Sequence, residues 1–109
     1  MIARTPEPPY VAVIFTSLRP VAEDGYGEIA ERMVQLAQTQ AGYLGHESVR
    51  QADGWGITVS YWADEDAARA WKANAEHREV QRLGRDQFYL SYAMRMAVVA
   101  RQTSFEATP

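Results

Sequence analysis

The sequence predicts an α+β fold with a four-stranded antiparallel sheet and two helices. Four segments are rich in the β-branched and aromatic residues typical of strands. Two amphipathic segments separate the first strand from the second and the third from the fourth. Asp53-Gly54, a strong signal for a tight hairpin turn, joins the second and third strands directly. The order strand, helix, strand, strand, helix, strand is that of the ferredoxin-like βαββαβ arrangement.

The first strand is expected at residues 10–18, YVAVIFTSL, after a proline-containing flexible arm at residues 1–9. Its apolar side chains alternate between the two faces, with Val11, Val13 and Phe15 on one and Tyr10, Ala12, Ile14 and Leu18 on the other. A strand that is apolar on both faces needs cover on both. We therefore expect it inside the sheet, with helices on one side and a second layer on the other.

The first helix is predicted at residues 24–41, where an acidic start suits the positive end of the helix dipole. One apolar stripe runs along it, formed by Tyr26, Ile29, Ala30, Met33, Leu36 and Ala37. Gly42 stands where many helices end in a left-handed residue. Residues 43–51 follow as a more polar strand, which is expected at an edge of the sheet.

The third strand is expected at residues 55–62 and pairs with the second across the turn. A two-residue turn at Asp53-Gly54 sets Ala52 opposite Trp55, and counting back sets His46 opposite Tyr61. A single bulge would shift this register.

The second helix is predicted to begin after Asp64, which is a suitable N-cap. A short helix at residues 76–83 is expected next, and Asn74 is a candidate N-cap for it. The last strand is predicted at residues 88–101, with a bulge at Val98-Val99 where the alternation breaks.

Length and composition narrow the class of protein. The 109 residues suit one domain, at residues 10–105, with a C-terminal tail at residues 106–109. The sequence has no cysteine, which excludes thiolate catalysis and cysteine-ligated metals. A net charge of −3 and scattered arginines argue against nucleic-acid binding. No apolar run is long enough to span a membrane and no secretory signal is recognisable, so a cytoplasmic protein is expected.

The apolar content predicts a second buried surface. Hydrophobic residues make up 47% of this small chain, and its central strands are apolar on both faces. Packing of a second copy against the open face of the sheet would supply the missing cover. The sequence thus predicts a homodimer formed through the sheet face, with a well-packed monomer as the alternative.

At this point the chain resembles the antibiotic biosynthesis monooxygenase family, the dimeric α+β barrel proteins. The matching pieces are YVAVIFTS, AGYLGHES, GITVSYWADEDAARAWKANAEH and QRLGRDQFYLSYAMRM. The resemblance implies a ferredoxin-like fold and a barrel formed by two sheets. It also implies one of two activities, cofactor-free oxygenation of polycyclic aromatic substrates or oxidative haem breakdown. Haem-degrading members carry an asparagine in the first strand, and YVAVIFTSL has none.

Three residues are candidates for substrate binding. Trp71 matches the helix tryptophan that lines the cavity in the family, and its indole could stack on a flat substrate or simply anchor the helix. Asn74 could orient a substrate oxygen instead of capping a helix. Arg95 could hold a substrate anion, as an arginine does in the aromatic-oxidising relatives, or pair with a carboxylate such as Glu47.

Three residues are candidates for catalysis. His77 lies near the position of the haem ligand in haem-degrading relatives, and a neutral imidazole is also a suitable general base. Its alternative is a surface histidine with a local hydrogen bond. His46 and Tyr61, as predicted cross-strand neighbours, could be acid–base equipment or a structural hydrogen bond.

The sequence therefore predicts a monooxygenase-like homodimer that binds a small apolar or aromatic ligand near Trp71. The expected reaction is cofactor-independent oxygenation of a small aromatic or polyketide-like substrate, with no metal. Haem binding or degradation and non-catalytic ligand binding are the two alternatives.

Overall fold

The computed structural model describes residues 2–20, 26–78 and 89–108, with the side chains of residues 26–30 and 75–78 left aside. The elements in chain order are β1 (Tyr10–Leu18), α1 (Tyr26–Gln38), β2 (Tyr43–Arg50), β3 (Trp55–Trp62), α2 (Glu65–Arg78) and β4 (Ser91–Val99). This order confirms the predicted βαββαβ fold class.

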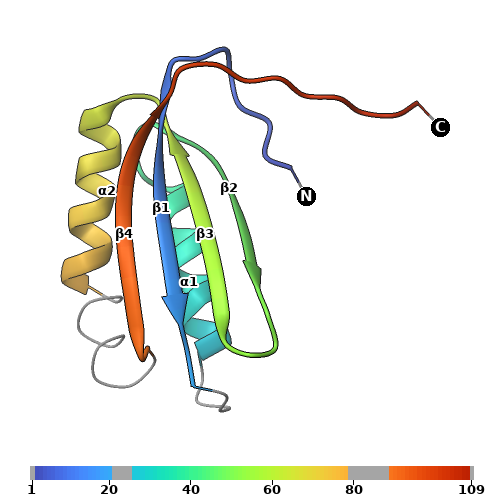
Figure 1. Ribbon diagram of the computed structural model, residues 1–109. Helices are drawn as coiled ribbons and strands as arrows, with labels where there is room; N and C mark the ends of the chain where they lie inside the picture. Colours follow the sequence, from blue (N-terminus) through green and yellow to red (C-terminus); the bar gives the residue numbers. More distant parts are fainter. Residues whose placement is uncertain (1, 21–25, 79–88, 109) are drawn as a thin grey trace.

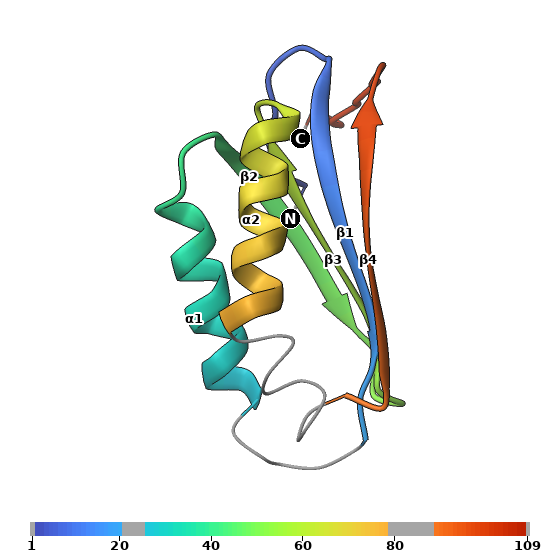
Figure 2. The same cartoon turned by 90° about the vertical axis from the view of Figure 1, so that its left-hand side faces the viewer.

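The four strands form one antiparallel sheet in the order β2-β3-β1-β4 (Figure 1). The apolar strand β1 lies inside and the more polar β2 lies at an edge, both as predicted. Both helices cover the same face of the sheet, which we call the helix face (Figure 2). We call the opposite side the open face, because no described helix lies against it. Within the described residues, no helix has the length and apolar character needed to cross a membrane.

The bounds of β1 and β3 are those predicted, whereas the helices and β4 differ. Helix α1 begins at Tyr26 and ends at Gln38, inside the predicted span. Helix α2 continues to Arg78, so Asn74 lies within a helix and the prediction that it caps a second one is wrong. The remainder of that short helix, and residue 88 of the predicted last strand, lie outside the described residues. Strand β4 pairs with β1 in unbroken register, so the predicted bulge at Val98-Val99 is absent.

The predicted N-cap of α2 is present, whereas Gly42 is not the predicted cap of the first helix, because α1 already ends at Gln38. The backbone N–H of Ala67 donates to Asp64 Oδ1 at 2.8 Å, which is the contact expected of an N-cap aspartate. Gly42 has a φ of +83°, the left-handed conformation that glycine adopts without steric cost. Its carbonyl accepts the N–H of Ala63 at 2.8 Å, which ties the loop after α1 to the end of β3.

The hairpin register differs from the prediction by one residue. Gln51 and Trp55 close the turn through a 2.7 Å hydrogen bond, so three residues form the loop, the last of them Gly54 with a φ of +103°. A three-residue loop that ends in a left-handed glycine is a common alternative to the two-residue turn. His46 consequently pairs with Ser60, and Gly45 pairs with Tyr61. Between Tyr43 and Gly45 the register shifts again, at a bulge.

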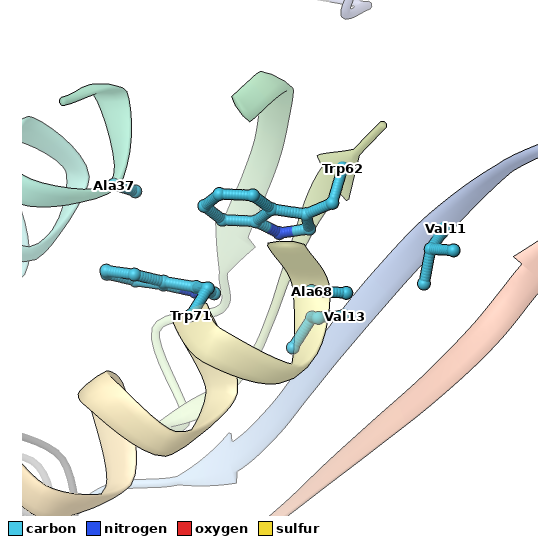
Figure 3. Packing of buried hydrophobic residues seen from close by; sticks show 6 residues of the cluster. All are labelled: Val11, Val13, Ala37, Trp62, Ala68 and Trp71. Carbon is cyan, nitrogen blue, oxygen red and sulfur yellow. The ribbon is translucent and has the colours of Figure 1, made fainter. Parts of the chain in front are cut away.

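The core lies between the helix face and the helices. Its buried members are Val11, Val13, Ala37, Trp62, Ala68 and Trp71. Figure 3 shows the indole rings of Trp62 and Trp71 lying one over the other next to these residues. Their centroids are 5.6 Å apart and their planes differ by 22°. This stacked pair fixes α2 against the end of β3.

Candidate functional site

A cavity of about 240 Å³ lies between the helix face of the sheet and the two helices. Its described lining comes from β1, β2, β3, β4, both helices and the residues before β4: Val13, Phe15, Met33, Val34, Ala37, His46, Ser48, Arg50, Thr58, Ser60, Trp71, Tyr89 and Met94. This is the place where the sequence predicted a ligand, beside Trp71. Clefts and cavities that are mainly apolar with a few polar groups are typical of small-molecule sites.

One wall of the cavity is polar because of strand alternation. His46 and Ser48 point to the helix face from β2, opposite Ser60 and Thr58 of β3. The hydroxyls of Ser48 and Thr58 share a 2.7 Å hydrogen bond. Ser60 Oγ accepts the indole N–H of Trp62 at 2.9 Å, a buried contact that satisfies both groups. The polar wall is therefore a hydrogen-bonded surface that still carries donor and acceptor capacity toward the cavity.

The apolar wall includes Trp71, which is only 7% exposed. One face of its indole packs on Trp62, which is fully buried. The two roles considered for Trp71, core anchor and cavity wall, are thus both present in one side chain. A ligand in the cavity would contact an aromatic surface that the core already holds rigid.

His46 contributes an imidazole to the described cavity lining. Its Nδ1 lies 2.6 Å from the phenol oxygen of Tyr43, and either ring tautomer is compatible with that contact. Burial raises the pKa of Tyr43, partly opposed by the side chain of Gln38, so the phenol stays neutral at physiological pH. The ring of Tyr43 packs edge-on against Trp62 at 5.6 Å. An imidazole held in this way can accept or pass on a proton.

A cationic group stands at the hairpin end of the cavity. Arg50 donates from Nη2 to Ser17 Oγ and from Nη1 to the carbonyl of Gly54, both at 2.5 Å. The guanidinium also lies over Gly56, where a Cβ would come within 2.6 Å of Cζ. The sequence prediction missed Tyr43 and Arg50. The position of Arg50 could have been predicted from Gly56, its partner across the hairpin, because a glycine leaves room for an arginine side chain to lie over the strand.

Tyr61 lies on the open face, so the predicted His46–Tyr61 pair is wrong. Its hydroxyl donates to Glu47 Oε1 at 2.6 Å, and the other oxygen of Glu47 accepts the backbone N–H of Ala3 at 2.9 Å. The hydrogen bond from Tyr61, followed by that from Ala3, lowers the pKa of Glu47. Burial and the Glu47 carboxylate raise the pKa of Tyr61 to about 12. This pair holds the N-terminal arm on the sheet.

Arg95 and Asn74 are not among the described residues that line the cavity. Arg95 is exposed on the open face, opposite Ile14 of β1. Asn74 lies in α2, and its buried Oδ1 has no hydrogen-bond partner among the described residues. His77 belongs to α2, and its side chain lies outside what the structure describes. Within the described residues, no group of three or more metal-binding side chains comes together.

A second, larger cleft of about 730 Å³ lies on the open face, between the N-terminal arm and the C-terminal segment. Its floor includes Tyr10 and Tyr61, whose rings meet edge-on at 5.7 Å. Thr5 Oγ1 lies 2.9 Å from the Tyr10 hydroxyl, and Gln102 Nε2 donates to the carbonyl of Pro6 at 3.1 Å. These contacts fix the root of both terminal segments at one end of the sheet (Figure 1).

Comparison with known proteins places the chain in a family. The family model of the antibiotic biosynthesis monooxygenases matches residues 9–83. The uncharacterized protein YqjZ of Bacillus subtilis is 54% identical over 105 residues, covering 96% of this chain and 92% of that protein. The jasmonate monooxygenase ABM of Pyricularia oryzae is 31% identical over 93 residues, which are 81% of this chain and 42% of that protein.

Solved structures show the same fold. A variant of SnoaB, a cofactor-independent oxygenase from Streptomyces nogalater, superimposes with a TM-score of 0.72 at 20% identity, covering 89% of this chain and 98% of that one. The protein SO0527 from Shewanella oneidensis superimposes with a TM-score of 0.69 at 11% identity, covering 86% and 94%. On the family match and the close sequence relative, the chain belongs to the antibiotic biosynthesis monooxygenase family.

Proposed function

We propose that this protein is a cofactor-independent monooxygenase that oxidises a small aromatic or polyketide-like substrate in the cavity between sheet and helices. The observation that carries the proposal is that His46 and Trp71 line one cavity, from the sheet and from a helix respectively. One supplies a proton acceptor and the other a flat apolar surface. The names of two relatives, a jasmonate monooxygenase and a cofactor-independent oxygenase, support the reaction class.

The reaction begins with loss of a proton from a phenol or an activated methylene group of the substrate. His46 accepts this proton at Nε2, in the tautomer whose Nδ1–H donates to the Tyr43 oxygen. The resulting carbanion reduces O₂ and combines with it, and a proton completes the hydroperoxide. Loss of water then leaves a carbonyl, so that R₂CH₂ and O₂ give R₂C=O and H₂O. Both electrons that reduce the second oxygen atom come from the substrate, so the balance needs no further reductant.

The cavity also limits the substrate. Its described volume of about 240 Å³ lies below the roughly 300–1,000 Å³ that is typical of pockets for drug-sized ligands. One or two fused rings stacked on Trp71 suit this space. Arg50 supplies positive charge at one end, which favours a substrate that carries an anionic or carbonyl oxygen there.

We also propose that the protein works as a homodimer packed through the open face. Three large apolar side chains on this face are exposed in the single chain: Val49 at 69%, Trp55 at 48% and Ile57 at 45%. Exposed apolar clusters of this kind mark interaction surfaces. Light scattering at micromolar concentration is expected to give twice the chain mass of 12.3 kDa. A mass of one chain would refute the dimer.

The proposed reaction is tested with phenols and activated methylene compounds of one to three rings. Binding is followed by quenching of tryptophan fluorescence, and turnover by oxygen uptake in metal-free buffer. Wild-type protein and the surface variant Arg69→Gln are expected to bind and consume oxygen. His46→Gln is expected to bind with similar affinity and to lose at least about a hundredfold in turnover. Binding without oxygen uptake would contradict the oxygenase and leave a ligand-binding protein.

A further inference from the structure

We propose a specific docking contact between two copies of the chain that face each other through their open faces. Phe105 of each C-terminal segment enters an apolar groove at the hairpin end of the other copy's sheet. This inference rests on the dimer proposed above and names the residues that complete it. It is carried by two features that a single chain leaves uncovered, an exposed phenylalanine and an empty groove on the same side of the sheet.

The first feature is the C-terminal segment, residues 100–108. All of its residues are exposed, and Phe105 is 86% exposed. Figure 1 shows the segment leaving the end of β4 and running away from the body of the protein. Its root is nevertheless fixed, because Gln102 bonds to the Pro6 carbonyl and to the Tyr10 hydroxyl. An extended segment with a fixed root and an exposed aromatic residue presents that residue in a defined direction.

The second feature is a groove of about 190 Å³ on the open face. It is lined by Thr16, Val49, Gln51, Trp55, Gly56 and Ile57. Three of these are the exposed apolar residues of the open face, and the groove has room for one phenyl ring. Its own Phe105 does not fill it, because the groove and the root of the tail lie at opposite ends of the sheet.

The register of β1 gives that separation. Tyr10, at the start of β1, pairs with Val99 at the root of the tail, whereas Leu18, at the other end, pairs with Trp55. Eight residue steps at about 3.3 Å place these ends roughly 26 Å apart. Suppose that two copies pack open face to open face about a two-fold axis that lies between the sheets, parallel to them and perpendicular to the strands. The strands of the second copy then run in the reversed direction. This arrangement sets the tail end of each copy over the hairpin end of the other, so the contact forms twice.

The cleft beside the tail fits the same arrangement. The cleft of about 730 Å³ between arm and tail would receive the hairpin tip of the partner, where Asp53 is exposed. Arg4 lines this cleft and offers Asp53 an opposite charge. Of the two carboxylates in the cleft, Glu47 is held by Tyr61 and Ala3, and Glu106 lies on the tail itself.

The absence of cysteine from the chain makes a direct test available. The double variant Val49→Cys/Phe105→Cys is oxidised mildly and run on a non-reducing gel. A covalent dimer that thiol reductant dissolves is expected. The matched control is Leu90→Cys/Phe105→Cys, because Leu90 is 68% exposed, as Val49 is at 69%, but lies outside the groove. Equal cross-linking in the two variants, or a link within one chain, would overturn the docking contact.

A second measurement separates the docking contact from the dimer itself. Phe105→Ala is expected to raise the dimer dissociation constant about tenfold or more, as loss of an aromatic anchor does. A dimer whose dissociation constant is unchanged by Phe105→Ala refutes the contact and leaves the dimer standing. A wild-type protein that is monomeric at every concentration refutes both.

Discussion

The phenol oxygen of Tyr43 lies 2.6 Å from Nδ1 of His46, in the wall of the cavity. This contact fixes the orientation of the imidazole, and in one tautomer it leaves Nε2 free to accept a proton. Tyr43 acts through His46 in the proposed reaction, so it is a positioning residue.

Tyr43→Phe is expected to lower kcat about tenfold, because the imidazole of His46 loses the hydrogen bond that orients it. KM is expected to stay nearly unchanged, because Tyr43 is not among the described residues that line the cavity. The measurement is kcat and KM from oxygen uptake. A KM that rises while kcat is unchanged would indicate a purely structural role for Tyr43.

Trp71→Ala is expected to destabilise the protein by about 3–5 kcal/mol, because it removes one ring of a buried stacked pair. Trp71→Phe keeps an aromatic surface and is expected to cost less while weakening ligand binding. Urea unfolding followed by circular dichroism measures both. Arg69→Gln, on the exposed side of α2, is the control and is expected to change the free energy of unfolding by under about 0.5 kcal/mol.

Gly42→Ala is expected to destabilise the fold by roughly 1–3 kcal/mol, for two reasons. Its φ of +83° is unfavourable for alanine, and the added Cβ would come within 2.6 Å of the Ala67 Cβ. The double variant Gly42→Ala/Ala67→Gly removes the clash and keeps the backbone strain. Thermal unfolding of both single variants and the double should therefore show a favourable coupling. Strictly additive losses would mean that the contact with α2 does not matter.

The Glu47–Tyr61 hydrogen bond predicts how stability depends on pH. The pKa of Glu47 is lowered in the folded protein, so its contribution is present above the ordinary value of 4.5 and is lost as pH falls below it. The pKa of Tyr61 is raised to about 12, so its contribution is present below pH 10 and is lost as pH rises through 12.

Glu47→Gln is expected to flatten the acid side of the stability curve, and Tyr61→Phe the alkaline side. Denaturant unfolding across the pH range measures both effects. A Glu47→Gln protein that keeps the full acid dependence of the wild type would show that other carboxylates dominate it.

The fold could be predicted because local signals agreed. Strands β1 and β3 alternate cleanly and are bounded by Arg19-Pro20 and by the hairpin glycine, so their bounds followed from composition. The dimer and the roles of Asn74, His77 and Arg95 remain predictions.

The site was harder to predict because it depends on single-residue offsets. Asp53-Gly54 suits a two-residue turn, but Ala52 joins the loop, and this moved His46 from Tyr61 to Ser60. A register shift of one residue changes which side chains share a face of the sheet. His46 and Tyr61 therefore lie on opposite faces, and the predicted acid–base pair does not form. The sequence did not indicate Arg50 as a cavity residue, because an arginine at the end of a strand usually extends into solvent.

The bulge between Tyr43 and Gly45 decides whether Tyr43 and His46 can meet. In an unbroken strand, side chains three positions apart point in opposite directions, so Tyr43 and His46 could not meet. The additional residue, Leu44, corrects the parity and brings both to the helix face. The contact between Tyr43 and His46 therefore depends on one inserted residue in β2. Deleting Leu44 alone would part the two rings while leaving every other residue of the cavity wall in the sequence.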